Sequence, residues 1–151
     1  FHNDSKNFTS INFNNIGKSY ISIARKFQPN FQHITDKQPL NFKWIGLIKL
    51  VLPNAKIIHC LRNPMDNCLS IYKNYFDFDD NPYAYDLNEL VEHYNLYQDL
   101  MKFWHKTLPG FIYDISYEKL IRNQKEETKK LLLACNLSWD EKCMNFYQNK
   151  L

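Results

Sequence analysis

The spacing of apolar residues changes along the chain, and this pattern predicts helices and strands in turn. Short runs rich in β-branched residues predict strands at residues 32–35, 56–61 and 111–116. Stretches in which apolar residues recur every three or four positions predict helices at residues 14–27, 41–52, 64–76, 87–105, 125–135 and 140–147. Asp86 is the expected N-cap of the longest helix. Strands that alternate with helices are typical of an α/β fold, a mainly parallel sheet covered by helices.

The segment at residues 57–72, IIHCLRNPMDNCLSIY, combines a strand, a turn and the start of a helix. Ile57 and Ile58 suit a buried strand, and Pro64 suits the first position of a helix, where its missing N–H has no partner to lose. Such a corner presents backbone N–H groups and the positive end of the helix dipole, with Arg62 beside them. The segment therefore predicts a site for an anion such as phosphate.

Composition and charge narrow the class of protein. The 151 residues are 44% hydrophobic and 16% aromatic, which predicts one globular domain and argues against disorder. The net charge of +3 is too small to indicate nucleic-acid binding. No apolar run approaches the roughly 18 residues of a membrane span, and the first ten residues lack the pattern of a signal peptide. We therefore expect neither a nucleic-acid nor a membrane partner.

Four cysteines, at positions 60, 68, 135 and 143, form no CxxC pair and lie within apolar patterns. Buried thiols are therefore favoured over disulfides or zinc ligands, which indicates a reducing compartment and a cytoplasmic protein. The chain has no initiator methionine, and its last residues, YQNKL, continue a helical pattern. We expect it to be a fragment of a longer chain.

The sequence GKS at residues 17–19 looks like the end of a phosphate-binding P-loop. Asn12, however, stands where the first glycine of that loop belongs, and no predicted strand precedes it. The other two glycines, at 46 and 110, are isolated, so no other segment can wrap a phosphate with backbone N–H groups.

The histidines are weaker candidates for chemistry. His59 and His33 lie in predicted strands, where a histidine is more often a hydrogen-bonded core residue than a general base. His93 and His105 lie on the long helix without partners at the spacing of metal ligands. We expect no metal site.

The segment ITDKQPLNFKWIGLIKLVLPNAKIIHCLRNPMDNCLSIY resembles the sulfotransferase family, in particular its bacterial members joined to tetratricopeptide repeats and the tyrosylprotein sulfotransferases. The resemblance continues through NPYAYDLNELVEHYNLYQDLMKFWHKTLPGFIYDISYEKLIRN and LLLACNLSWDEKCMNF. It covers nearly everything from about residue 17 to the end. It implies an α/β fold akin to that of nucleotide kinases and other P-loop NTPases. It also implies 3'-phosphoadenosine 5'-phosphosulfate (PAPS) as sulfuryl donor, without a metal.

In this family a strand-loop-helix of the form R-x(7)-S binds the 3'-phosphate of the donor, and Arg62 and Ser70 match it. An arginine suits the role because its forked, permanently charged guanidinium can bind a phosphate through two N–H groups. Asn63 could add a donor. Taken in isolation, the same residues have another interpretation, in which Arg62 pairs with Asp66 and Ser70 bonds only its own backbone.

Three further residues match positions of the family. Lys37 resembles the lysine of a DKxP segment near the substrate pocket, where a cation could offset charge on the sulfuryl group during transfer. Tyr117 resembles the tyrosine beside the adenine, and Glu118 is expected to cap the short helix that follows. The alternatives are a surface lysine before Pro39 and an ordinary interfacial tyrosine.

The family's 5'-phosphosulfate loop, which normally precedes this region, is not found in the chain, and neither is the acid usually taken as its base. The resemblance therefore implies one partial sulfotransferase domain over residues 1–151, inactive alone, which holds the 3'-phosphate end of the donor. The acceptor hydroxyl or amine stays open among peptide tyrosines, sugars and metabolites. An N-terminal repeat domain could belong to the full-length protein. The alternative hypothesis is a non-catalytic module that binds an adenine nucleotide or a protein partner.

Overall fold

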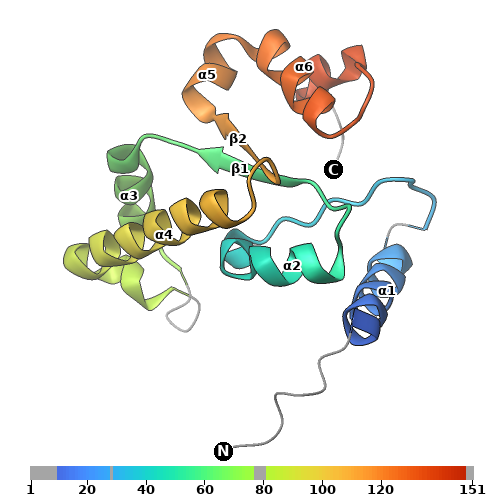
Figure 1. Cartoon of the computed structure of the whole chain (residues 1–151). Helices are drawn as coiled ribbons and strands as arrows, with labels where there is room; N and C mark the ends of the chain where they lie inside the picture. The colour runs from blue at the N-terminus through green and yellow to red at the C-terminus, as the bar shows by residue number, and fades with distance from the viewer. Residues whose placement is uncertain (1–9, 28, 77–80, 149–151) are drawn as a thin grey trace, which may run out of the picture. The chain divides into compact units, whose positions relative to one another are not determined.

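A computed structural model describes residues 10–27, 29–76 and 81–148 of the chain (Figure 1). The chain divides into two compact units, Phe1–Ala55 and Lys56–Leu151. Helices dominate both units, and the two described strands lie in the second.

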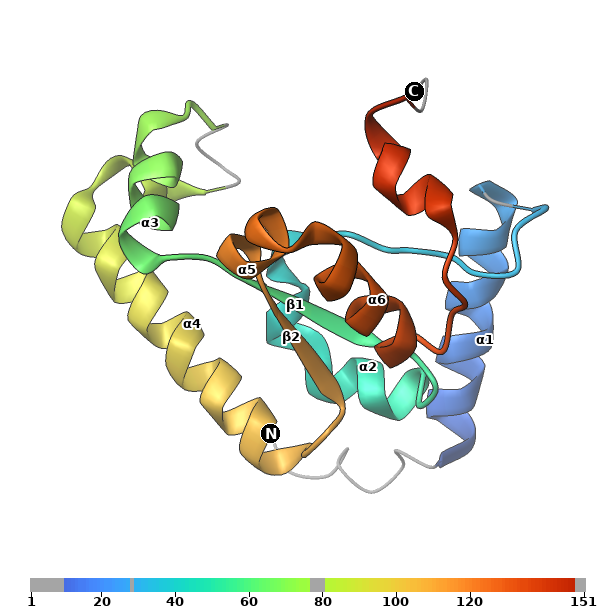
Figure 2. The ribbon, with the colours of Figure 1, turned by 90° about the horizontal axis from the view of Figure 1, so that it is seen from above.

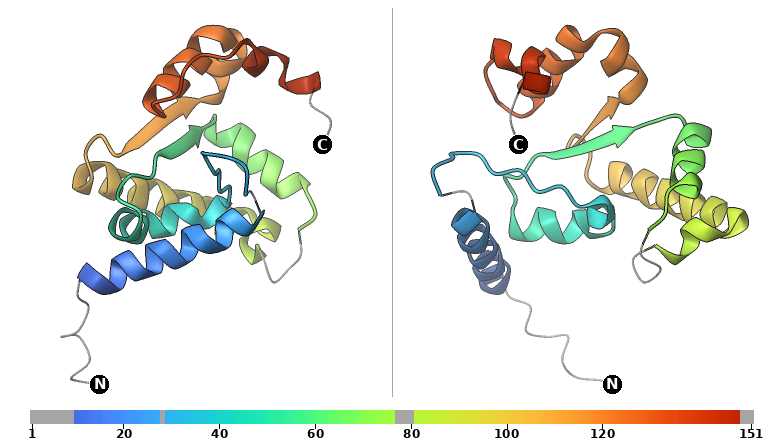
Figure 3. Two further views of the ribbon diagram at one scale, coloured as in Figure 1. Left: turned by 90° about the vertical axis from the view of Figure 1, so that its right-hand side faces the viewer. Right: turned by 180° about the vertical axis from the view of Figure 1, so that it is seen from behind.

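The first unit contains α1 (Ser10–Phe27), the 3-10 helix η1 (Pro39–Trp44) and α2 (Ile45–Val51). Helix α1 packs along α2 (Figure 3), and the contact is made at Gly17. A Cβ atom at Gly17 would lie only 2.0 Å from the carbonyl oxygen of Val51, so glycine is what allows this approach. Gly17 therefore serves helix packing, in agreement with the expectation that its segment is no P-loop.

Two predictions for the first unit differ from the structure. The strand predicted at residues 32–35 is wrong, because this segment is irregular and mostly exposed. Four residues gain little as a strand without a ladder partner, and in the part of the chain that is described the two strands pair only with each other. The helix predicted at residues 41–52 begins as a 3-10 turn at Pro39 and becomes an α-helix only at Ile45.

The second unit is built on a parallel pair of strands, β1 (Ile57–Leu61) and β2 (Ile112–Ser116), which lie side by side (Figure 2). Residues 57–61 stand in register with residues 112–116. Two parallel strands must be joined by a long crossover connection, and here the residues between β1 and β2 form helices. The α/β class and the parallel sheet flanked by helices are confirmed.

Helices surround this sheet on both sides. Figure 1 shows α6 on one side of the strands and α4 on the other. The predicted helices at 64–76, 87–105 and 125–135 are confirmed to within three residues at each end, whereas the last one is a 3-10 helix with a non-helical residue at Asn145. The elements are α3 (Pro64–Lys73), η2 (Pro82–Tyr85), α4 (Leu87–Thr107), α5 (Tyr117–Arg122), α6 (Gln124–Ala134) and η3 (Glu141–Gln148).

The core of the second unit is formed mainly by α4 and β2. Leu90 and Met101 are buried on α4, and Ile112 and Ile115 are buried on β2. The predicted cap of α4 is confirmed, since Asp86 accepts hydrogen bonds from the first turn at 2.7 and 3.0 Å. The helix that contributes most to this core is thus capped at its start.

The cysteines are free thiols, of which Cys60 is exposed and the other three are half-buried. Cys60 departs from the expected buried setting because it lies near the end of β1, where the neighbouring Leu61 is exposed too. None of the described helices combines the length and apolar character needed to cross a membrane.

Candidate functional site

The carboxyl ends of the two strands bring Arg62 and Tyr117 together. Leu61 and Ser116 are the last register partners, so the residues that follow them leave the sheet side by side. The guanidinium carbon of Arg62 lies 5.2 Å from the centroid of the Tyr117 ring, within the range of a cation–π contact. Both side chains are exposed. The edge of the sheet therefore presents a cation and an aromatic ring to solvent.

Asn63 links this corner to the start of α3. Its side-chain Oδ1 accepts hydrogen bonds from the N–H groups of Met65, at 2.9 Å, and Asp66, at 3.3 Å. Its own N–H donates to Oε1 of Glu118 at 2.7 Å. Three N–H groups expected to face a phosphate are therefore engaged within the protein, and Asn63 acts as the N-cap of α3.

Glu118 is the acidic member of the corner. Its Oε2 accepts a hydrogen bond from the Ser116 hydroxyl at 3.0 Å. The hydrogen bond from the Asn63 N–H, above all, lowers the pKa of Glu118, and the charge of Arg62 adds to the effect. The expected capping role of Glu118 is wrong, because the Ser116 side chain caps α5 by accepting from the Lys119 N–H at 3.3 Å.

Ser70 lies on α3, nearly two helical turns beyond Pro64, and is half-buried. Its carbonyl accepts a hydrogen bond from the Asn74 side chain at 2.7 Å. Arg62 faces Tyr117 and Glu118, and within the described residues it forms no ion pair with Asp66. The alternative interpretation, in which Arg62 pairs with Asp66, is therefore wrong.

Lys37 belongs to the first unit. It is exposed in the irregular segment before η1, so it does not leave the end of a strand as the sequence suggested. Its neighbour Asp36 accepts a hydrogen bond from the Tyr20 hydroxyl, which raises the pKa of Tyr20 to about 12. This bond ties the segment that carries Lys37 to α1.

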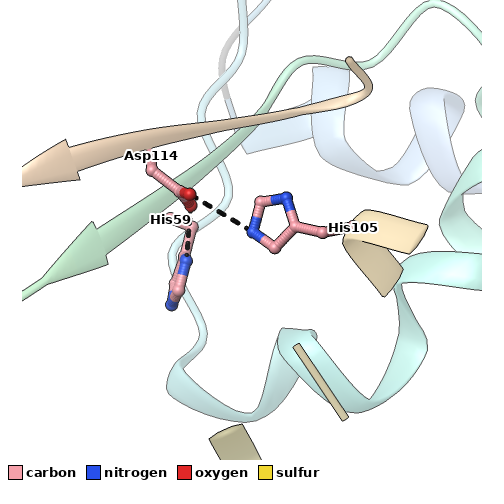
Figure 4. A group of neighbouring side chains, drawn as sticks. All are labelled: His59, His105 and Asp114. Atoms are coloured by element: carbon pink, nitrogen blue, oxygen red, sulfur yellow. Dashed lines mark hydrogen bonds and ion pairs between the residues drawn. The ribbon is translucent and has the colours of Figure 1, made fainter. Parts of the chain in front are cut away.

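A second group of polar side chains lies between the strands and α4. Figure 4 shows the carboxylate of Asp114 between the rings of His59 and His105. Nδ1 of His59 is 2.7 Å from Oδ1 of Asp114, and Nε2 of His105 is 3.3 Å from Oδ2. The other ring nitrogen of His59 is hydrogen-bonded to the Tyr97 hydroxyl. His59 is thus a half-buried, hydrogen-bonded residue, as the sequence predicted.

The prediction that His105 lacks partners at metal spacing is wrong. One ligand atom each from His59, His105 and Asp114 lies within 4.8 Å of the others, close enough for the three to hold a metal ion. Spacing along the sequence could not reveal them, because they come from β1, α4 and β2. The available signal was register, since strands at 57–61 and 112–116 place His59 opposite Asp114.

The fold and the corner define an α/β protein of the parallel-sheet type, in which ligands bind beyond the carboxyl ends of the strands. The chain belongs to the sulfotransferase family, whose family model, described as "Sulfotransferase family", matches residues 2–141.

A curated relative is an uncharacterized protein of Aquifex aeolicus (strain VF5), 35% identical over 133 residues. The match covers 87% of this chain and 18% of that protein, so the chain spans under a fifth of the relative's length. No solved structure matches the chain.

Proposed function

We propose that this chain carries the part of a PAPS-dependent sulfotransferase that binds the 3'-phosphate of the donor. The observation that carries the proposal is the pairing of Arg62 with Tyr117 beyond the carboxyl ends of β1 and β2. A guanidinium suits a phosphate, and an aromatic ring next to it suits the adenine that the same nucleotide bears. Membership of the sulfotransferase family supports this reading, because its members generally take PAPS as donor.

In this proposal each residue of the R-x(7)-S pattern has one task. Arg62 donates N–H groups to the 3'-phosphate, and the hydroxyl of Ser70 donates to the same group from α3. The Glu118 carboxylate, which accepts from the Asn63 N–H, holds the turn between β1 and α3 in place. Tyr117 packs against the adenine, and its cation–π contact with Arg62 orients the guanidinium.

The reaction is sulfuryl transfer, in which an acceptor hydroxyl or amine attacks the sulfur and loses its proton. The bond from sulfur to the 5'-phosphate oxygen breaks, and 3',5'-adenosine bisphosphate leaves. We propose that Lys37 offsets the negative charge that builds on the bridging oxygen. We further propose that both units belong to one sulfotransferase domain, because the family match runs across both. The four free cysteines favour a reducing, cytoplasmic setting.

Calorimetric titration of 3',5'-adenosine bisphosphate into the chain tests the proposal. We expect binding that requires the 3'-phosphate, so AMP should bind at least roughly 30-fold more weakly, the worth of one charge-assisted hydrogen bond of about 2 kcal/mol. Arg62→Ala should lose affinity by a similar factor, and Arg62→Lys should recover only part of it because it lacks the fork. Arg122→Ala removes another exposed arginine of the second unit and should leave binding unchanged.

Equal affinity for AMP and the bisphosphate in a folded chain would overturn the 3'-phosphate site. It would favour an adenine-nucleotide module instead. Binding that survives in Arg62→Ala but fails in Arg122→Ala would move the site away from the ends of the strands.

A further inference from the structure

The side chains of His59, His105 and Asp114 form a group that is separate from the proposed donor corner. His59 and Asp114 occupy the middle of the two strands, three residues before Arg62 and Tyr117, and His105 lies in the last turn of α4. Because register partners of a parallel pair project to the same side of a sheet, the two strands direct these side chains toward α4. Three elements of the second unit thus meet at one carboxylate (Figure 4).

The separations suit a four-coordinate metal. Zinc–nitrogen and zinc–oxygen bonds of about 2.0–2.2 Å place tetrahedral ligand atoms roughly 3.4 Å apart. Asp114 already stands 2.7 Å from one imidazole nitrogen and 3.3 Å from the other, and no pair of ligand atoms exceeds 4.8 Å. To reach tetrahedral spacing, any pair near the 4.8 Å limit would have to approach, and the 2.7 Å pair of His59 and Asp114 would have to open.

The donor types agree with the separations. Two imidazoles and one carboxylate form the ligand set of zinc sites that keep one position open. Mg²⁺ and Ca²⁺ require six or more oxygen ligands, which this group does not supply. The side chains of His105 and Asp114 are 37% and 40% exposed, so an ion can enter and a water can occupy the fourth position.

The surroundings of His59 also suit a ligand. A metal-bound histidine commonly donates its second ring N–H to a fixed partner, which sets its tautomer and orientation. The Tyr97 hydroxyl stands at that second nitrogen. A phenol oxygen can accept a hydrogen bond as well as donate one, so Tyr97 can receive the second ring N–H of His59.

We propose that His59, His105 and Asp114 bind one Zn²⁺ ion through Nδ1, Nε2 and a carboxylate oxygen, with Tyr97 holding His59 in the binding tautomer. His59 then gives up its Nδ1 proton and carries a proton on Nε2, which it donates to Tyr97. The ion ties the end of α4 to both strands. Neither the site nor its test depends on the proposed sulfuryl transfer.

Titration of Zn²⁺ into the metal-free, untagged chain tests this site at neutral pH. We expect one ion per chain with micromolar affinity or tighter, and a melting temperature that rises by roughly 5 °C at 100-fold excess over the dissociation constant. His105→Ala and Asp114→Asn should each weaken binding by roughly 100-fold, and Tyr97→Phe by roughly 10-fold. His33→Ala, which removes an exposed histidine of the first unit, is the matched control.

Two spectra keep the test decisive if a variant fails to fold. Co²⁺ in place of Zn²⁺ should give d–d absorption without a thiolate charge-transfer band, because no cysteine is a proposed ligand. Of the five histidines, only His59 and His105 should shift their ring ¹⁵N resonances when Zn²⁺ is added to the unaltered chain. A thiolate band, unshifted rings of these two residues, or no binding by folded protein would overturn the site.

Discussion

Two opposite charges, Arg62 and Glu118, meet beyond the ends of the two strands although they come from segments far apart in the sequence. Arg62 faces an aromatic ring, and Glu118 is bound by a backbone N–H and a hydroxyl. Arg62 and Glu118 therefore have different partners. The turns that follow β1 and β2 place the two residues near each other. An arriving phosphate would meet Arg62 from the solvent side, where the guanidinium is exposed.

The lowered pKa of Glu118 predicts a pH dependence of stability. The folded state favours the ionised carboxylate, so this contribution is present at neutral pH and is lost as the pH falls below the ordinary pKa of 4.5. Glu118→Gln should therefore show a smaller drop in melting temperature between neutral and acid pH than the unaltered chain. Thermal scans across that range check it, with Glu89→Gln, another exposed acid of the same unit, as control. Parallel melting curves for all three proteins would contradict the assignment.

At the residue scale, the strand, turn and helix that follow one another indicated Arg62, and the resemblance to the family's R-x(7)-S pattern added Ser70. The sequence did not show which acceptors bind the backbone N–H groups at the start of α3. That Asn63 bonds Met65 and Asp66 is a local cap, but that its N–H meets Glu118 depends on pairing between segments 55 residues apart. The cluster around Asp114 was missed for the same reason, since its members are neighbours only once the sheet forms.

At the scale of elements, the long amphipathic helix and the two strands in the second unit were predictable, because both period and caps were clear. Asp86 caps α4, and Asn63 with Pro64 opens α3. Two smaller segments were predicted less well. The segment at residues 32–35 has the composition of a strand but lies outside the described sheet, and the last helix is of the 3-10 type.

The contact between α1 and α2 predicts the effect of a single methyl group. Gly17→Ala would place a Cβ atom 2.0 Å from the carbonyl oxygen of Val51, so the helices must separate. Overpacking of this kind costs about 1–3 kcal/mol and outweighs the roughly 1 kcal/mol that alanine gains in helix propensity. We expect a lower free energy of unfolding in urea. Ser19→Ala, at an exposed position of α1, should change it by less than roughly 0.5 kcal/mol. A stabilised Gly17→Ala variant would show that the helices do not touch there.

At the scale of the whole molecule, few side chains among the described residues are buried, and most of these belong to the second unit. Leu90 is 1% exposed on α4, whereas Leu96 on the same helix is 65% exposed. The small core places much of the stability on a few positions, since each fully buried leucine accounts for several kcal/mol.

These two leucines form a matched pair for measurement. Leu90→Ala should lower the free energy of unfolding by roughly 3 kcal/mol, because it removes buried methyl groups and leaves a cavity. Leu96→Ala should lower it by less than roughly 0.5 kcal/mol. Urea denaturation followed by circular dichroism would measure both. Equal losses would mean that α4 does not pack through Leu90.

The register of the sheet also has a consequence for how the chain acquires its structure. Each residue of β1, at 57–61, pairs with a residue of β2 that lies 55 positions further along the chain, at 112–116. During synthesis at about 5–20 residues per second, the first strand waits several seconds for the second to be made. Closing so large a loop also slows folding once the chain is complete. The helices between the strands can form during that interval, so we expect the sheet, and with it the alignment of Arg62 and Tyr117, to assemble after α3 and α4.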